Sequence, residues 1–170
     1  IFAYVYLAIA AAAFLCYILA GMSPFDAICH AMSVVATGGF STRNASIAAF
    51  DSRWVEIITM IFMYLSSLHF GVLYMTVVSR SLRPMRNPIF KFYTISVLVV
   101  SFILAVGLRF NGICEGWGEA FWKGTFSTLA ISSTTGFAIL DNALWPDWMS
   151  IMLVCVGIVC GCSGSTSSGI

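Results

Sequence analysis

The sequence has little charge. Only 9% of its 170 residues are Asp, Glu, Lys or Arg, while 60% are hydrophobic and the mean hydropathy is +0.97. Soluble domains carry about 25% charged residues, so this composition excludes an ordinary soluble domain and indicates an integral membrane chain. The formal net charge of +1 creates no field that would attract nucleic acid, so nucleic-acid binding is excluded as well.

Metal-binding and signal-peptide patterns are also lacking. The six cysteines include no C-x-x-C pair, and most of them lie in apolar stretches, where a thiol behaves as a small hydrophobic side chain. We therefore expect no structural zinc site. The first apolar run has no charged head and the last has no polar tail, so we expect the chain to be a fragment of a longer protein.

Four apolar segments have the length of membrane crossings. They cover residues 1–20, 54–79, 92–108 and 148–170. At about 1.5 Å per residue, about 20 residues reach the roughly 30 Å of the hydrocarbon core. The third segment is short, but Lys91 and Arg109 bracket it with side chains long enough to reach the interfaces. The fourth ends in a Gly/Ser/Thr-rich stretch, so we expect its helix to break midway.

A shorter apolar segment lies within each pair of crossings. The first opens with Ser23 as N-cap and Pro24 at the first helical position, followed by residues 27–36. The second covers residues 117–133, with Glu119 in its first turn. A helix with the length of the first short segment reaches only about 20 Å, which is too short to cross a bilayer. Each pair therefore has the plan of a re-entrant pore loop.

Each short segment ends in a tract of threonine and glycine. The tracts are Thr37-Gly38-Gly39-Phe40 and Thr134-Thr135-Gly136-Phe137. Non-helical backbone at membrane depth is tolerated only where it is buried in protein or lines a watery path, so the tracts predict a polar pathway. Glycine allows backbone that turns carbonyls inward, and oxygen ligands without carboxylates suit potassium better than calcium or magnesium. The alternative is a pair of ordinary glycine caps at helix ends.

The two halves of the chain are interpreted as repeats. Aligning residues 24–40 with 121–137 gives identities only at the first, third and fourth positions of the two tracts. We expect one unit at 1–79, a basic linker at 80–91 and a second unit at 92–170. The linker contains Arg80, Arg83, Arg86 and Lys91 and no acidic residue, so the positive-inside rule places it in the cytoplasm and both tracts toward the outside.

Three stretches carry a family signature. They are Phe25-Asp26-Ala27-Ile28-Cys29-His30, Ala36-Thr37-Gly38-Gly39-Phe40-Ser41-Thr42 and Gly161-Cys162-Ser163-Gly164-Ser165-Thr166. They closely resemble the TrkH branch of the TrkH/TrkG/KtrB potassium transporters, and the resemblance extends over nearly the whole chain. Members of that family contain four M1-pore-M2 repeats around one potassium path. The resemblance implies an all-α integral membrane fold in which this chain is the second and third repeats of a pseudo-tetrameric pore.

The resemblance also implies roles for particular residues. It assigns one quarter of a selectivity filter to Thr37, Gly38, Gly39 and Phe40 and the next quarter to Thr134, Thr135, Gly136 and Phe137, with K⁺ held by their backbone carbonyls. It assigns an intramembrane gating loop to Gly161, Cys162, Ser163, Gly164, Ser165, Thr166, Ser167, Ser168 and Gly169. The loop departs from the usual pattern at Ser167 and Ser168, where glycines are expected, and neither tract has the T-V-G-Y-G run of tetrameric potassium channels.

The expected function is channel-like potassium uptake, with no catalytic residue and no cofactor. The family resemblance implies a homodimer in a bacterial cytoplasmic (inner) membrane that binds a cytosolic nucleotide-binding regulatory ring. Whether sodium or protons move with potassium, as in a symport, is left open by the residues.

Two other functions fit parts of the sequence. Gly161-Cys162-Ser163-Gly164 matches the G-x-S-G pattern of rhomboid intramembrane serine proteases, with His69 as the possible base, although both histidines precede the serine. A non-conducting structural membrane subunit is the other alternative. Within its crossing, His69 can serve as a proton relay or gate element, or simply hydrogen-bond to a neighbouring helix.

Overall fold

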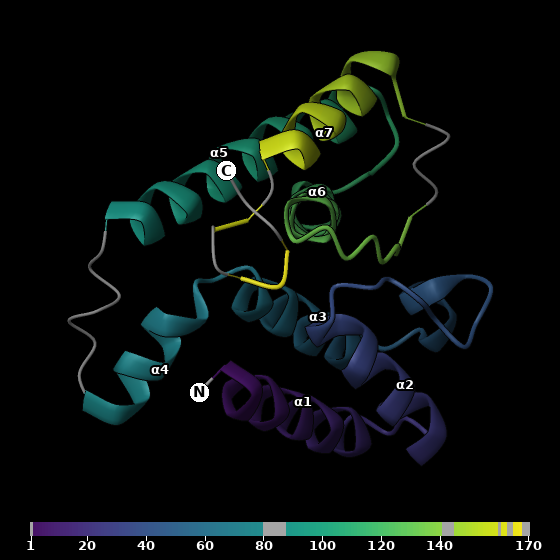
Figure 1. Cartoon of the computed structure of the whole chain (residues 1–170). Helices are drawn as coiled ribbons and strands as arrows, with labels where there is room; N and C mark the ends of the chain where they lie inside the picture. Colours follow the sequence, from purple (N-terminus) through teal and green to yellow (C-terminus); the bar gives the residue numbers. More distant parts are fainter. Residues whose placement is uncertain (1, 80–87, 141–144, 160, 163–164, 168–170) are drawn as a thin grey trace.

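The chain forms two successive helical units, each with a middle helix that leads into a Thr/Gly tract. The computed structural model describes residues 2–79, 88–140, 145–159, 161–162 and 165–167. The first unit contains α1 (Phe2–Leu19), α2 (Pro24–Val35), the 3₁₀ helix η1 (Ser46–Phe50), α3 (Arg53–Ser66) and α4 (Phe70–Ser79). The second contains α5 (Pro88–Phe110), α6 (Trp117–Ser132) and α7 (Asp147–Val159). No strand occurs in these ranges, which confirms the all-α class. Figure 1 shows the first unit below the second.

The short helix of the first unit starts where its sequence predicts. The Asp26 N–H donates to Ser23 Oγ at 3.1 Å, and Pro24 occupies the first turn, where its missing N–H leaves no donor unpaired. The helix ends before Thr37, as expected from the change to Thr and Gly. In the second unit, α6 also ends immediately before its Thr/Gly tract. Each Thr/Gly tract therefore follows the C-terminal end of a helix, α2 or α6.

The segment expected as the second crossing is not one helix. It is divided into α3 and α4 at residues 67–69, so the expected crossing consists of two helices. The Ser66 and Ser67 hydroxyls both donate to the Met63 carbonyl, at 2.9 and 2.8 Å, and such bonds compete with helical pairing. His69 then starts α4, since its Nδ1 accepts the Gly71 N–H at 2.9 Å. The Nδ1 of His69 therefore binds the main chain of its own helix, at the start of α4.

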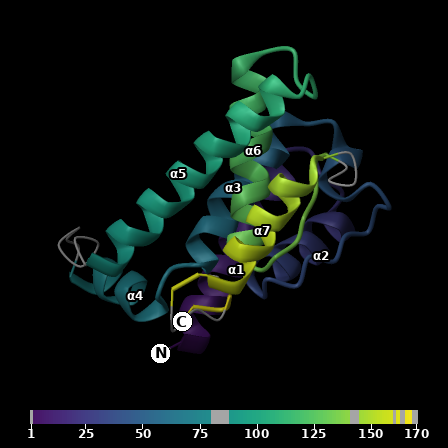
Figure 2. The same ribbon diagram turned by 90° about the horizontal axis from the view of Figure 1, so that it is seen from above.

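Packing joins the units through α6, which contacts α3 of the first unit. Helix α6 packs along α5 and also contacts α7, and Figure 2 shows α6 beside α5. One core cluster runs from α1 through α2 and α3 to α6, and includes Tyr17, Met63 and Phe126. A second joins α5, α6 and α7 around Leu104 and Met149. Helices α2 and α6 are thus packed among the other helices.

The outward faces of the long helices are apolar. Exposed large hydrophobic side chains include Leu7 on α1, Phe102 on α5 and Ile151 on α7. Among the described helices, α5 is the one whose length and composition suffice for a membrane span, and Ala3–Leu19, Pro24–Val35 and Asp147–Val159 are apolar but shorter. The fourth expected crossing breaks as predicted, because α7 ends at Val159 and residues 161–162 and 165–167 are not helical.

Candidate functional site

The two Thr/Gly tracts have the same unusual backbone. Thr37 and Gly39 have φ of 51° and 68°, and their counterparts Thr134 and Gly136 have φ of 54° and 78°. The residue between each pair does not have positive φ. Alternating left-handed and other conformations allows successive carbonyls to point to one side, as an ion-lining backbone requires. Left-handed threonine is uncommon, and here it directly follows each helix C-cap, with Gly38 N–H donating to the Ser33 carbonyl at 2.8 Å as in a helix-capping motif. A second left-handed residue, Gly39 or Gly136, follows two positions later, which a simple cap does not require.

The tracts lie directly against each other. A Cβ atom added to Gly39 would stand 1.9 Å from the Thr135 carbonyl oxygen, so no side chain fits there. A Cβ atom added to Gly136 would meet nothing within 4 Å, and Phe40 is 82% exposed whereas its counterpart Phe137 is 3% exposed. The tracts thus form one side of a site, with open space beyond each outer edge.

The polar stretch after α7 lies against both tracts. The Thr37 hydroxyl is 3.3 Å from the Thr166 carbonyl, and the Thr134 hydroxyl is 3.4 Å from the Ser167 carbonyl. Thr37 Oγ1 is closer to the Ala36 carbonyl, at 2.8 Å, so its single hydrogen is shared between two acceptors. Successive carbonyls of this stretch therefore approach corresponding hydroxyls of the two units.

The same stretch is docked on the C-terminal end of α3. Thr166 donates to the Ser66 carbonyl through its N–H at 3.3 Å and through its hydroxyl at 3.0 Å, and Cys162 N–H donates to the Ser67 carbonyl at 3.0 Å. An added Cβ on Gly161 would collide with Ser167 Oγ at 2.1 Å. The break between α3 and α4 exposes the carbonyls that receive these bonds. The other residues expected in the gating loop, Ser163, Gly164, Ser168 and Gly169, lie outside the described residues.

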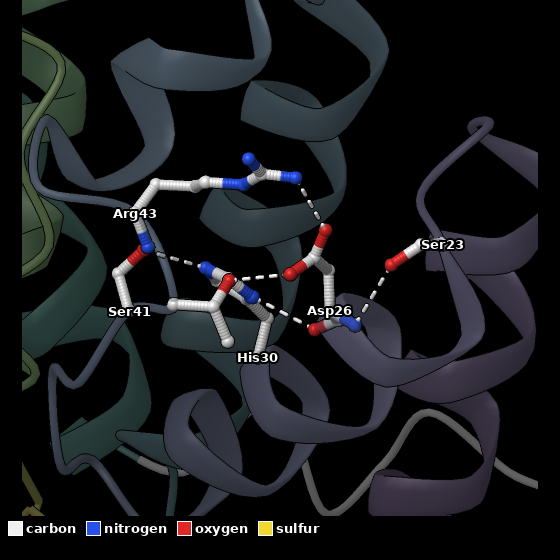
Figure 3. Close-up of polar contacts among 6 residues, drawn as sticks. Ser23, Asp26, His30, Ser41 and Arg43 are labelled. Atoms are coloured by element: carbon white, nitrogen blue, oxygen red, sulfur yellow. Dashed lines mark hydrogen bonds and ion pairs between the residues drawn. The ribbon is translucent and has the colours of Figure 1, made fainter.

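A polar network holds the segment that follows the first tract, and sequence reasoning missed most of it. Figure 3 shows Asp26, in the first turn of α2, between the segment that follows the tract and the N-cap. Its carboxylate accepts from the Thr42 hydroxyl at 2.5 Å and from Arg43 at 3.1 Å. These bonds, that of Thr42 first, hold the pKa of Asp26 below its ordinary value against the opposite effect of burial. The Asp26 carboxylate therefore ties the segment after the first tract to the start of α2.

His30 links this network to the second unit. It lies one turn after Asp26 on α2, is fully buried, and contacts Ser41 through Nε2 at 2.9 Å. Its ring stacks on Phe137 of the second tract, with centroids 5.8 Å apart. The signal in the sequence was the spacing of Asp26 and His30, which places both on one face of a helix.

The segment after the second tract is held differently. Ala138 N–H donates to Ser46 Oγ at 3.2 Å, and the Ala138 carbonyl accepts from Ala48 N–H at 3.3 Å. Both partners belong to η1 in the first unit. The first unit therefore supports both tracts.

A second bridge between the units lies at the start of α3. The Glu56 carboxylate accepts from the Trp122 indole N–H of α6 and pairs with Arg53 at 3.4 Å. The Arg53 guanidinium stands 4.8 Å from the centre of the Trp122 ring. Nearby on α6, Lys123 pairs with Glu119 at 2.5 Å and holds the pKa of Glu119 below its ordinary value. The contacts of Trp122 with Glu56 and Arg53 fix α6 relative to α3.

The chemistry available at the tracts is that of neutral oxygen. The described residues contain no group of three His, Cys, Asp or Glu side chains that could hold a metal ion. Carbonyls and threonine hydroxyls remain, and these suit a weakly hydrated monovalent cation. The protease alternative needs His69 as a base, but its Nδ1 is occupied by the Gly71 N–H.

Comparison with known proteins places the chain in one family. The TrkH family, described as "Cation transport protein", matches residues 1–117. The chain is 35% identical over 170 residues to the Trk system potassium uptake protein TrkH of Vibrio parahaemolyticus, covering 98% of this chain and 35% of that protein. It is 33% identical to the Escherichia coli K12 protein of the same name, covering 98% of this chain and 34% of that one.

A solved structure agrees with the sequence comparison. The potassium transporter TrkH from Vibrio parahaemolyticus matches with a TM-score of 0.89 and 32% identity, over 96% of this chain and 36% of that one. The chain thus spans about a third of the length of the relatives it matches. These relatives are transporters and not enzymes, which agrees with the expected absence of catalysis. The chain, with its two helical units and paired Thr/Gly tracts, belongs to the TrkH family, whose description is "Cation transport protein".

Proposed function

We propose that the chain forms half of the wall of a potassium-selective pathway. The observation that carries the proposal is the repeated backbone of the tracts: left-handed threonine and glycine at matched positions, with Gly39 against the Thr135 carbonyl. A dehydrating cation must exchange water for protein oxygen, and carbonyls provide it without a full charge that would hold the ion too tightly. Each tract also follows a helix C-terminus, whose partial negative charge favours a cation.

The complete pathway needs two further tracts from the rest of the transporter. Phe137 packs on His30 of the preceding unit, while Phe40 has no such neighbour and is 82% exposed. By the repeat relation, Phe40 packs on a preceding repeat, and the open space beside Gly136 receives a following one. Four repeats then surround a single ion path, with the units at 1–79 and 92–170 as the second and third.

The stretch at residues 161–169 serves as the gate. Its described residues accept hydrogen bonds from Thr37 and Thr134, which puts them immediately beside the inner end of the filter. Their attachment to α3 is made of a few single hydrogen bonds, each contributing about 1 kcal/mol. Such an attachment can release and reform during transport without unfolding the helices.

The transporter acts in a bacterial cytoplasmic membrane, as a homodimer. The basic linker at 80–91 faces the cytoplasm, where a nucleotide-binding regulatory ring binds, and the tracts face outward. Potassium therefore enters the filter from outside and passes the gate last.

Uptake in liposomes tests the proposal. The full-length transporter that contains this chain is reconstituted, and rubidium uptake is measured against competing potassium or sodium. We expect saturable uptake that potassium suppresses more strongly than sodium does. Uptake no greater than in protein-free liposomes would contradict the proposal and favour a non-conducting subunit.

A further inference from the structure

His30 is held by both of its ring nitrogens. Nδ1 lies 2.8 Å from the Asp26 carbonyl oxygen, and because a carbonyl only accepts, Nδ1 carries the hydrogen. Nε2 lies 2.9 Å from Ser41 Oγ, and in the neutral ring it accepts the Ser41 hydroxyl hydrogen. Ser41 Oγ in turn accepts the Arg43 N–H at 3.1 Å. The imidazole thus joins α2 to the residue that directly follows the first tract.

The faces and edges of the same ring contact three aromatic side chains. Phe137 is stacked on it at 20°, with centroids 5.8 Å apart. Phe50, the last residue of η1, meets it edge-on at 5.2 Å, and Tyr17 of α1 does so at 6.3 Å. These separations fall within the range of favourable aromatic pairs. One side chain therefore contacts the residue that follows the first tract, the last residue of the second tract and the 3₁₀ helix that supports the second tract.

We propose that His30 is a positioning residue that sets ion selectivity by fixing the first and second tracts relative to each other. The inference rests on the proposed function of the tracts. Discrimination between two monovalent cations depends on how many oxygens surround the ion and how closely they are held. A buried residue with two directional hydrogen bonds and a stacked ring restricts sliding of the tracts, which an apolar side chain of similar size does not.

In the described part of the second unit, the position aligned with His30 carries no equivalent side chain. Ser127 stands at the aligned position on α6, and Ala138 stands where the first unit has Ser41. The segment after the second tract is instead bonded to η1, whose last residue packs on His30. Removing His30 therefore loosens both tracts, whereas no single side chain of α6 has the same reach.

Separate variants remove the two kinds of contact. His30→Phe keeps an aromatic ring and removes both hydrogen bonds of the imidazole. Ser41→Ala removes the bond to Nε2 together with the bond from Arg43 N–H, and Phe137→Leu removes the stacking. Leu104→Ala is the control, since it truncates a fully buried side chain in the cluster of α5, α6 and α7 away from the tracts. Each variant of the full-length transporter is assayed for thermal stability and for the ratio of sodium to rubidium uptake.

We expect His30→Phe to raise the uptake ratio by about fivefold, which converts to about 1 kcal/mol. Ser41→Ala should raise it in the same direction by less, and Leu104→Ala should lose stability with an unchanged ratio. An unchanged ratio in both Ser41→Ala and Phe137→Leu would overturn the inference, even if His30→Phe failed to fold. If the wild type takes up rubidium selectively and the variants keep the same uptake ratio, this inference alone is overturned. If the wild type shows no uptake, the proposed function is overturned as well.

Discussion

Replacing Gly39 with alanine tests the contact on which the paired tracts depend. The added methyl carbon would lie 1.9 Å from the Thr135 carbonyl oxygen, and Cβ atoms in proteins do not approach other heavy atoms closer than 3.0 Å. The two tracts must therefore separate by about 1 Å. The obstacle is main chain on both sides, so no rotamer change relieves it. The Thr135 carbonyl, a proposed ion ligand, must move or rotate.

The expected loss of stability has two parts, and Gly112 separates them. Alanine in a left-handed conformation costs about 1–2 kcal/mol, and overpacking a tight contact costs a further ~1–3 kcal/mol. Gly112, after α5, has φ of 69°, nearly that of Gly39, but an added Cβ there meets nothing within 4 Å. Gly112→Ala therefore carries the backbone strain alone. Gly39→Ala should be the less stable variant by about 1–3 kcal/mol.

The assay combines thermal unfolding in detergent with uptake in liposomes. Gly112→Ala should lower the unfolding temperature slightly and leave the ratio of sodium to rubidium uptake unchanged. Gly39→Ala should lower the unfolding temperature further and either raise that ratio or abolish uptake. Equal stability and equal ion preference in the two variants would refute the close approach of Gly39 to Thr135 and the filter built on it.

Three other substitutions test separate parts of the structure. Thr166→Val keeps its N–H bond to α3 and loses its hydroxyl bond of about 1 kcal/mol, so rubidium uptake should become about fivefold faster with unchanged ion preference. The Thr42 hydroxyl is the chief group that holds the pKa of Asp26 below its ordinary value of 3.8 in the folded protein. The Asp26 carboxylate therefore stabilises the fold above pH 3.8, and this contribution is lost as the pH falls through the pKa of the folded state. The unfolding temperature should therefore fall more steeply below pH 3.8 in the wild type than in Asp26→Asn. Glu56→Ala removes the acceptor of the Trp122 indole and should destabilise the protein by about 1–3 kcal/mol with little effect on ion preference, as measured by unfolding and uptake.

Helix starts and tract positions were predictable because their causes are local. Ser23 and Pro24 define the start of α2 through capping, and the change from apolar residues to Thr37 and Gly38 defines its end. Run length alone then showed that this helix was too short to cross a bilayer. Such features depend on residues within one or two turns, which the sequence displays directly.

The break between α3 and α4 was not predictable because its cause is distant. The residues around Ser67 lie in an apolar run whose composition suits a continuous crossing. Two serines in succession weaken the helix, but the freed carbonyls need partners, and these are the donors of Cys162 and Thr166 about 100 residues later. Without that stretch, an interrupted helix at membrane depth would leave unpaired backbone groups.

The support of the two tracts was also missed, because it depends on side chains that only the first unit has. Asp26 and His30 were visible as part of a family motif, yet neither tract shows from sequence which side chains hold it. Their partners Ser41 and Arg43 lie after the tract, and only the turn of the chain brings them back over α2. The repeated tract was visible in the sequence, whereas the contacts by which the first unit supports both tracts were not.

This asymmetry explains why the two units share a backbone but so few residues. Each tract needs the left-handed threonine and glycine, and the identities are retained there. The His30 ring contacts both Ser41, after the first tract, and Phe137 of the second tract, so one such side chain serves both. The aligned residue of the second unit, Ser127, is different. In exchange, Ala138 depends on main-chain and hydroxyl contacts to η1 of the first unit. The second tract therefore cannot hold its geometry without the first unit, and substitutions in α2 or η1 should alter ion preference more than equivalent ones in α6.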